Sequence, residues 1–232
     1  MSDQKSQKGI FITLEGADGV GKTTQAKLIA QKIAVKVHEE TEVLQMREPG
    51  GTPICEEIRN ILKTSKFLSP ICELMLFNAA RSQLVEEVIR PTTDAGGIVV
   101  CDRFLDSTIA YQHCGNGIPW STVNSIIQTA IAGKVPDITI MLQLNEEEAN
   151  IRANKKGITR DGLVKYDTST LEYKRRVAEG FLNQAKLNPN RIKIVSAEGT
   201  EDEVCERIWE ILEPILDAAN LLLRPTVGND RS

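Results

Sequence analysis

Apolar segments alternate with amphipathic segments along most of the chain. Five short apolar runs have the length and composition of strands: Ile10 to Leu14, Thr41 to Met46, Ile98 to Cys101, Ile138 to Leu144 and Ile192 to Val195. Between them, apolar residues recur at helical spacing, as in residues 25–33. This alternation is typical of a parallel sheet with helices on both faces. We therefore expect an α/β fold with a five-stranded parallel sheet.

Two capping signatures predict where helices begin. Thr200 is followed three residues later by Glu203, and a stripe of apolar residues follows to Leu216, as expected for a helix packed on the sheet. Asn145 and Glu148 form the same signature, so we interpret the carboxylates of residues 146–148 as a helix start rather than a metal site. We expect one domain over residues 9–216, a disordered lead-in over 1–8 and a frayed C-terminal tail over 217–232.

Composition narrows the functional classes. The chain has 232 residues, enough for one domain of this type, and a net charge of −4, which argues against non-specific nucleic-acid binding. No apolar run approaches the roughly 20 residues that span a membrane, and the first residues lack the apolar core of a signal peptide. The five cysteines are scattered without a C-x-x-C pair. We therefore expect a cytoplasmic protein with reduced thiols and no zinc site.

A glycine-rich segment links the first strand to the first helix and matches the pattern G-x-x-x-x-G-K-[ST]. It consists of Gly16, Ala17, Asp18, Gly19, Val20, Gly21, Lys22, Thr23 and Thr24. Glycines let successive backbone N–H groups point at phosphate oxygens, and the helix adds the positive end of its dipole. Lys22 would reach the β- and γ-phosphates, and the Thr23 hydroxyl would ligate Mg²⁺. The segment predicts binding of a nucleoside triphosphate.

Other polar segments also follow predicted strands, where ligands bind in parallel sheets. These are residues 47–52 and 102–104. A charged segment over residues 152–167, with two glycines, is either a solvated face or a mobile lid that carries cations to the phosphates. The N-K-x-D motif of regulatory GTPases is missing, because residues 154–157 lack the Asp. The length leaves little room for a motor ATPase, so a small-molecule phosphotransferase remains.

Six motifs in order resemble those of thymidylate kinases of the bacterial type, a family of P-loop nucleoside monophosphate kinases. They lie at residues 14–25, 47–52, 77–83, 102–104, 107–112 and 136–139, and the resemblance covers residues 10 to about 215. It implies transfer of the γ-phosphoryl group of ATP to dTMP, which gives dTDP and ADP for dTTP synthesis. It also implies Mg²⁺ as cofactor, a short mobile lid and a homodimer.

The resemblance assigns residues to the phosphates. Lys22 would bind the donor, and Asp18 would accept the 3′-hydroxyl of dTMP, although an Asp here also suits a turn. Arg103 would bridge the acceptor phosphate and the transferring group, although a solvated surface arginine is the alternative. Asp102 resembles the carboxylate that holds Mg²⁺ or its waters, and Glu48 would share that role on the substrate side.

The resemblance also assigns residues to the base. Phe77 would stack on the pyrimidine, although core packing is common for such a residue, and Arg81 would hydrogen-bond its exocyclic oxygen. Thr108 and Gln112 resemble the polar pair at the N3 edge. The remaining two are Tyr111, which resembles the aromatic placed against a ribose 2′-hydroxyl, and Arg59, which is either a base-side arginine or part of a helix-surface salt bridge.

The chain departs from the family pattern in its cations. Gly19 stands where some thymidylate kinases have a loop arginine, so a lid residue must neutralise the transition state. We expect this residue to be Arg160, with Lys165 and then Arg152 as the next candidates. Phe104 replaces the usual tyrosine after Asp-Arg. Two other functions stay open: a kinase for another nucleoside monophosphate or a deoxynucleoside, and a regulatory nucleotide-binding module without turnover.

Overall fold

A computed structural model describes residues 8–145 and 170–223 of the chain. Helices with π-type hydrogen bonding carry the label η. Strands and helices alternate in the order β1 (Ile10–Glu15), α1 (Lys22–Ala34), β2 (Val43–Arg47), α2 (Pro53–Thr64), α3 (Pro70–Leu84), η1 (Val85–Ile89), α4 (Arg90–Asp94), β3 (Ile98–Asp102), α5 (Leu105–Thr108), η2 (Ile109–Gly115), α6 (Trp120–Ile131), β4 (Ile138–Gln143), α8 (Leu171–Leu187), β5 (Ile192–Ser196) and α9 (Glu201–Ala218).

All neighbouring strands of the sheet run parallel, in the order β2-β3-β1-β4-β5. The prediction of a five-stranded parallel sheet is confirmed, with strand ends shifted by one or two residues. The central strand β1 is buried along its whole length, whereas the edge strand β2 is partly exposed, which explains why its apolar run is less regular. This order brings the carboxyl ends of β2, β3 and β1 side by side.

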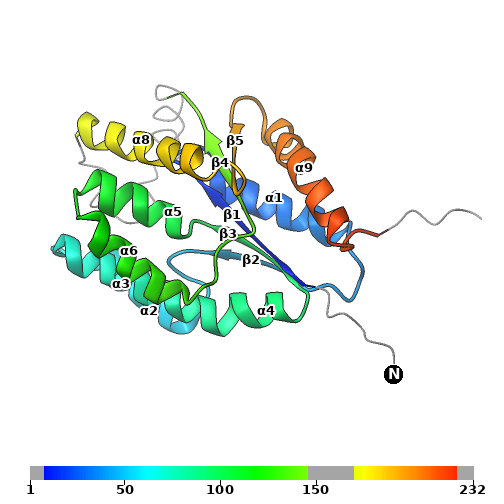
Figure 1. Cartoon of the computed structure of the whole chain (residues 1–232), viewed down its shortest axis with the longest axis horizontal. Coiled ribbons are helices and arrows are strands. Elements are labelled where there is room, and N and C mark those ends of the chain that lie inside the picture. The colour runs from blue at the N-terminus through cyan, green and yellow to red at the C-terminus, as the bar shows by residue number, and fades with distance from the viewer. Residues whose placement is uncertain (1–7, 146–169, 224–232) are drawn as a thin grey trace, which may run out of the picture.

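The two faces of the sheet pack against different helices, and β1 shows how (Figure 1). Its side chains alternate, as strand geometry requires. Ile10, Ile12 and Leu14 join the core formed with α1 and α9. Phe11 faces the opposite side and packs in the core that holds residues of α2, α3 and α6. Glu15 follows Phe11 by four residues in the same strand, so its side chain points to the same second face. It lies under the site described below.

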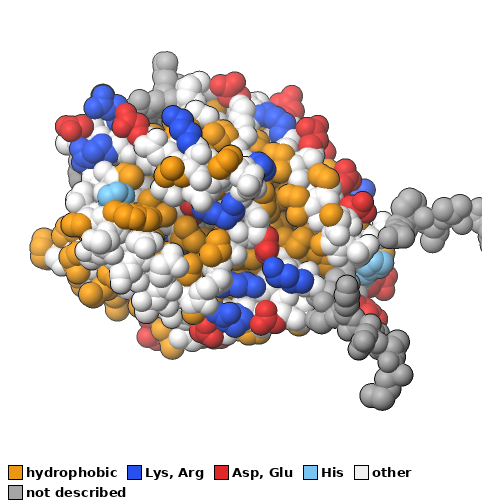
Figure 2. All heavy atoms as spheres, viewed as in Figure 1, with side chains coloured by type: hydrophobic (Ala, Val, Ile, Leu, Met, Phe, Trp, Pro, Cys, Tyr) orange, Lys and Arg blue, Asp and Glu red, His pale blue; other side chains and the backbone are white. Residues whose placement is uncertain are grey.

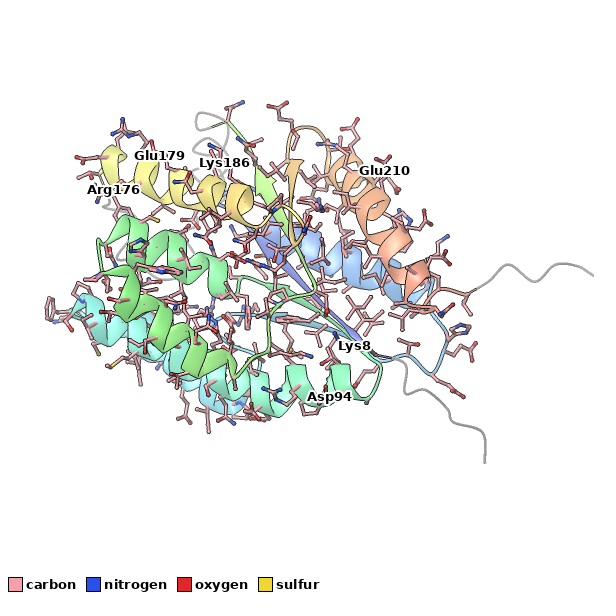
Figure 3. All side chains as sticks on the ribbon, in the orientation of Figure 1. Lys8, Asp94, Arg176, Glu179, Lys186 and Glu210 are labelled. Carbon is pink, nitrogen blue, oxygen red and sulfur yellow. The ribbon has the colours of Figure 1, made fainter. Side chains whose placement is uncertain are left out.

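Helix starts follow the local signatures in the sequence. The Thr200–Glu203 capping box is formed at the start of α9, as predicted. Thr52 and Ser69 cap α2 and α3 with a single side-chain bond each, to the N–H groups of Cys55 and Cys72, and each is followed by a proline at the first helical position. Figure 3 shows the outer sides of two helices carrying charge, with Arg176, Glu179 and Lys186 along α8 and Glu210 on α9.

The expectation of a frayed segment directly after residue 216 is wrong. Helix α9 continues to Ala218, and Leu221 is only 1% exposed in the core beside α1 and α9. Leu222 pairs with Val37, and the Leu223 N–H donates to the Lys36 carbonyl at 2.8 Å. Leu221 and Leu222 pack against the apolar core beside α1 and α9, which explains why the chain stays on this surface after α9.

Some predictions fall on residues outside the described ranges. These are the helix start at residues 146–148, the lid at 152–167, the lead-in at 1–7 and the tail from residue 224. In the part of the chain that is described, no helix is both long enough and apolar enough to cross a membrane. All five cysteines are free thiols.

Candidate active site

The site forms where β2, β3 and β1 end. Asp102 at the end of β3 lies opposite Leu14 on one side and Arg47 on the other. Beyond the strands, the Glu48 N–H donates to the Asp102 carbonyl at 2.9 Å, and the Arg103 N–H donates to the Leu14 carbonyl at 3.0 Å. The glycine-rich segment and the segments at 47–52 and 102–104 therefore meet at one edge of the sheet.

The glycine-rich segment has the backbone that its sequence requires. Gly16, Gly19 and Gly21 have φ angles of 132°, 77° and 93°, which side chains rarely adopt. A Cβ atom on Gly16 would lie 2.4 Å from the Leu142 carbonyl oxygen. Gly21 is the N-cap of α1, which has no side-chain cap and no acidic residue in its first turn. The buried Lys22 donates from Nζ to the Ala17 carbonyl at 2.5 Å, so the loop curls around this ammonium. This geometry suits an anion at the helix start.

Thr23 and Asp102 form an oxygen pair beside this loop. The Thr23 hydroxyl donates to Asp102 Oδ2 at 2.5 Å. The other carboxylate oxygen, Asp102 Oδ1, is buried and has no hydrogen-bond partner among the described residues. A hydroxyl and a carboxylate are the oxygen ligands that Mg²⁺ prefers, together with water and phosphate oxygens. The pair therefore fits a magnesium ion, although nowhere in the described ranges do three His, Cys, Asp or Glu residues cluster as a metal cage.

Arg103 connects the loop to the second face of the sheet. Its Nη2 donates to Asp18 Oδ1 at 2.6 Å, its Nη1 donates to Ser107 Oγ at 3.0 Å, and its guanidinium lies 5.4 Å from the centre of the Tyr111 ring. The side chain is only 13% exposed, so the alternative of a solvated surface arginine is wrong. Asp18 does more than shape a turn, because its carboxylate forms this ion pair.

A buried ion pair joins Arg81 of α3 to Glu48. Arg81 Nε and Nη2 donate to the same oxygen, Glu48 Oε2, at 2.9 and 2.7 Å. Glu48 Oε1 is buried without a partner among the described residues. Burial raises the pKa of Glu48 to about 6, and the charge of Arg81 limits the rise. This carboxylate is thus turned toward the helix that carries Phe77 and Arg81.

Arg81 also contacts the helix that follows β3. Its Nη1 donates to Asn78 Oδ1 at 3.0 Å and to Thr108 Oγ1 at 2.9 Å, and its guanidinium lies 5.1 Å from the centre of the Phe104 ring. Phe77, one helical turn before Arg81, is half-buried rather than part of the closed core. These contacts fix the direction of the guanidinium.

Gln112 and Arg59 are buried at the two ends of this group. Gln112 Nε2 donates to Glu73 Oε1 at 3.1 Å, and both side chains are buried. Arg59 is 3% exposed and donates from Nη1 to the Pro49 carbonyl at 2.8 Å. The alternative of a helix-surface salt bridge for Arg59 is therefore wrong. Tyr111 is buried edge-on against Phe181 of α8.

The sequence patterns missed Glu15, which supports the Arg103 segment. Its carboxylate accepts from the backbone N–H groups of Phe104 and Ser107 at 2.8 and 3.1 Å, and from Ser107 Oγ at 2.6 Å. Burial and the nearby charge of Asp106 raise the pKa of Glu15 to about 7 against the effect of these hydrogen bonds. A charged residue at the end of a mostly apolar run was the available signal.

Glu73, Asp106 and Arg191 were also missed. Asp106 is fully buried and forms two hydrogen bonds of 2.7 Å with the Arg191 guanidinium, which also donates to Thr139 Oγ1 at 2.8 Å. Asp106 and Arg191 are 85 residues apart in the sequence, so no local sequence pattern predicts this ion pair. The predicted lid cations Arg160, Lys165 and Arg152 lie outside the described residues.

Chemically, the site presents two groups of side chains joined by Arg103 and Glu48. One group, around Lys22 and Thr23, is suited to phosphates and a cation. The other, around Arg81 and Gln112, offers hydrogen bonds beside a half-buried ring. This arrangement can hold two anionic nucleotides with their phosphates meeting near Asp18 and Arg103.

Comparison with known proteins identifies relatives over almost the whole chain. A family model described as thymidylate kinase matches residues 14–208. The thymidylate kinase of Syntrophotalea carbinolica is 41% identical over 203 residues, which cover 86% of this chain and 93% of that protein. A thymidylate kinase of a Synechococcus strain is 40% identical, with 90% and 97% covered. The crystal structure of thymidylate kinase from Ehrlichia chaffeensis superposes with a TM-score of 0.71 at 31% identity, covering 88% of this chain and 99% of that one.

Proposed function

The chain belongs to the thymidylate kinase family, and we propose that the residues gathered beyond β1, β2 and β3 carry out its phosphoryl transfer. Proteins of this family phosphorylate dTMP to dTDP with ATP as the donor, and so does this chain. The observation that carries the assignment of residues is the contact of Arg103 with Asp18, which connects the glycine-rich loop to the acceptor side.

The donor phosphates are held by the loop and the start of α1. Backbone N–H groups of residues 19–24 point at the phosphate oxygens, and Gly16, Ala17 and Asp18 shape the entrance of the loop. Lys22 leaves the Ala17 carbonyl and binds the β- and γ-phosphates. The uncapped start of α1 supports this role.

Magnesium is held by Thr23 and Asp102. The unpartnered Asp102 Oδ1 and the adjacent Thr23 hydroxyl support the assignment. When bound, Mg²⁺ neutralises charge on the β- and γ-phosphates. Glu48 pairs with Arg81 and serves the metal through a bridging water.

Arg103 and Asp18 serve the reacting groups. In the proposed complex, Arg103 binds the phosphate of dTMP and the transferring phosphoryl group, for which a planar guanidinium offers paired donors. Asp18, released from Arg103, accepts a hydrogen bond from the 3′-hydroxyl of the acceptor. Arg160 of the lid supplies a further cation, and Lys165 or Arg152 takes this role if Arg160 does not.

The base and sugar of dTMP are read by the second group of residues. Phe77 stacks on the pyrimidine and Arg81 donates to its exocyclic oxygen. The rest of this group consists of Thr108 and Gln112 at the N3 edge, Tyr111 against the 2′ position and Arg59 as a further base-side arginine, held by its hydrogen bond to the Pro49 carbonyl. The fixed direction of the Arg81 guanidinium supports this assignment.

An acceptor panel tests the proposed specificity. The protein is incubated with ATP, Mg²⁺ and, separately, dTMP, dUMP, dCMP or thymidine, and ADP release is measured. We expect dTMP to give the highest kcat/KM. Higher turnover with another acceptor would identify a different nucleoside monophosphate kinase or a deoxynucleoside kinase. A folded protein without acceptor-dependent ADP release would instead be a regulatory nucleotide-binding module.

We also propose a cytoplasmic homodimer that forms through α2 and α3. Apolar side chains on this part of the surface are exposed: Phe67 by 80%, Met75 by 55% and Ile54 by 51%. Figure 2 shows acidic side chains along α9, and apolar side chains both over the middle of this face and at the edge near α2 and α3. Large exposed apolar patches are typical of interfaces.

Light scattering after size-exclusion chromatography tests the dimer. We expect Met75→Lys to shift the mass from dimer to monomer. Leu187→Lys on α8, where the leucine is 75% exposed, is the matched control and should leave the dimer intact. If Met75→Lys keeps the mass of a dimer, as the control does, the interface lies elsewhere on the surface.

A further inference from the structure

Two helices beside the base-reading residues are connected by a pair of hydrogen bonds one turn apart. Glu73, Phe77 and Arg81 follow one another at intervals of four on α3. Thr108 and Gln112 follow each other at the same interval along α5 and η2. Arg81 Nη1 donates to Thr108 Oγ1 at 2.9 Å, and Gln112 Nε2 donates to Glu73 Oε1 at 3.1 Å.

The Glu73 contact decides which way the Gln112 amide points. A glutamine amide has one donor side and one acceptor side, which differ by a rotation of 180° and are told apart only by their partners. A carboxylate accepts hydrogen bonds and has no proton to donate. The NH₂ group of Gln112 must therefore face Glu73, and Oε1 must face the other way.

We propose that Glu73 is a specificity-determining positioning residue, because it fixes Gln112 with its oxygen toward the N3 edge of the acceptor base. This inference builds on the proposed function, in which Gln112 reads that edge. Thymine carries a proton on N3 and needs an acceptor there, whereas N3 of cytosine is itself an acceptor. An amide held with its oxygen outward therefore favours thymine, and a rotated amide would meet the N3 proton with a donor.

Burial makes this orientation effective. Glu73 is 6% exposed and Gln112 is 2% exposed. Water competes poorly for a hydrogen bond between such groups, and a mismatched donor pair in a buried site loses its full hydrogen bond. Each end of the pair is held by a helix, so the amide direction is set before the base binds.

Glu73→Gln tests the inference with almost no change in shape. The new amide at position 73 can either accept or donate a hydrogen bond. It therefore keeps its bond to Gln112, but it no longer fixes which side of the Gln112 amide faces the base. We expect KM for dTMP to rise about three- to tenfold at saturating ATP, the loss of about one hydrogen bond, with kcat within twofold of the wild type. Glu87→Gln is the matched control, because Gln83 Nε2 donates to Glu87 Oε2 at 2.6 Å on the surface of the same helical segment. The control should leave KM unchanged.

The exchanged pair Glu73→Gln with Gln112→Glu provides the second measurement. In this double variant the amide at 73 donates to the carboxylate at 112, which then presents an oxygen acceptor to N3. We expect KM to return to within threefold of the wild type. A KM within twofold of the wild type for Glu73→Gln alone would overturn the inference. So would a parallel fall of kcat and Tm without recovery in the double variant, because that pattern describes a purely structural contact.

The inference and the proposed function fail separately. Turnover of dTMP by the wild-type protein judges the function. The change of KM among the variants judges the role of Glu73.

Discussion

At the scale of single residues, Arg103 combines a strained backbone with several fixed contacts. Its φ of 72° lies in the left-handed region, which costs a non-glycine residue roughly 1 kcal/mol or more. The hydrogen bonds of Arg103 to the Leu14 carbonyl and of Phe104 to Glu15 hold the turn. Strain that persists in this way is common where a side chain must be aimed. The turn aims the guanidinium at Asp18.

Replacing Arg103 should reduce the rate of transfer more than substrate binding. Arg103→Lys keeps the charge but loses the planar pair of donors, and we expect kcat to fall about 10²-fold; Arg103→Ala should lower it about 10³-fold or more. Steady-state rates of dTDP formation measure both. Arg175→Lys, on the exposed side of α8, is the control and should retain wild-type kcat. A kcat within threefold of the wild type for Arg103→Ala would remove Arg103 from the reaction.

Removing an oxygen ligand should weaken magnesium binding. In Asp102→Asn the side chain keeps its size but loses its charge, so we expect the Mg²⁺ concentration for half-maximal rate to rise about ten- to a hundredfold. Thr23→Ser keeps the hydroxyl and should behave like the wild type within threefold, whereas Thr23→Ala should not. Titration of the rate with Mg²⁺ at fixed ATP measures the shift. Unchanged titrations for Asp102→Asn and Thr23→Ala would contradict the assignment.

At the scale of elements, helix starts are set by short-range hydrogen bonds. Thr200 Oγ1 accepts from the Glu203 N–H at 3.2 Å, and Glu203 Oε2 accepts from the Thr200 N–H at 2.7 Å. These bonds satisfy two backbone donors that a helix start leaves open. A simpler cap begins α2 and α3, where a threonine or serine accepts one backbone N–H and a proline follows. The sequence therefore predicts these boundaries well.

Loss of the α9 cap should lower stability without affecting the chemistry. For Thr200→Ala we expect the free energy of unfolding to fall by about 1 kcal/mol, with kcat unchanged. Urea denaturation measures the difference. Thr129→Ala is the comparison, because the Thr129 hydroxyl donates to the Ser125 carbonyl within α6 and caps no helix start, so this variant should change stability by about 0.5 kcal/mol or less. Equal effects of both substitutions would show that the capping box contributes nothing specific.

At the scale of the whole molecule, the order of the strands collects buried charge around the site. Glu15, Glu48 and Asp106 come from three different segments, and each pairs with a group far away in the sequence. Their burial disfavours the charged form of a carboxylate unless partners compensate. Compensation is incomplete for Glu15 and Glu48, whose pKa values are raised to about 7 and about 6.

These raised pKa values predict a pH-dependent stability. The carboxyl groups of Glu15 and Glu48 bind their protons more tightly in the folded protein than in the unfolded chain, where a glutamate has its ordinary pKa near 4.5. Their stabilising contribution is therefore complete below about pH 4.5 and is lost as the pH rises through 6 and 7. For Glu15 alone the rise of the pKa from 4.5 to about 7 limits this loss to roughly 3.5 kcal/mol.

Urea denaturation between pH 5.5 and 8.5 checks this dependence. Glu15→Gln should make the decline of the free energy of unfolding with pH shallower than in the wild type. Glu210→Gln, at the exposed outer side of α9, should keep the wild-type slope. Identical slopes for the wild type and Glu15→Gln would show that Glu15 titrates in the folded protein as it does in the unfolded chain.

The sequence by itself determined what depends on neighbours a few residues away. The alternation of strands and helices, the glycine-rich loop at residues 16–24 and the cap at Thr200 are local patterns, because hydrophobic period, turn conformation and capping act within one or two turns of chain. The motif order further sufficed to suggest the family, which the comparisons confirmed.

Only the tertiary structure decided which distant side chains meet. Arg103 and Asp18 are separated by 85 residues, Arg81 and Glu48 by 33, and Gln112 and Glu73 by 39. It also settled that Arg59 is buried and that Leu221 belongs to the core. Such contacts follow from the strand order β2-β3-β1-β4-β5. That order is chosen by the burial of the whole sheet between its helices, a property of the assembled chain that no short segment carries.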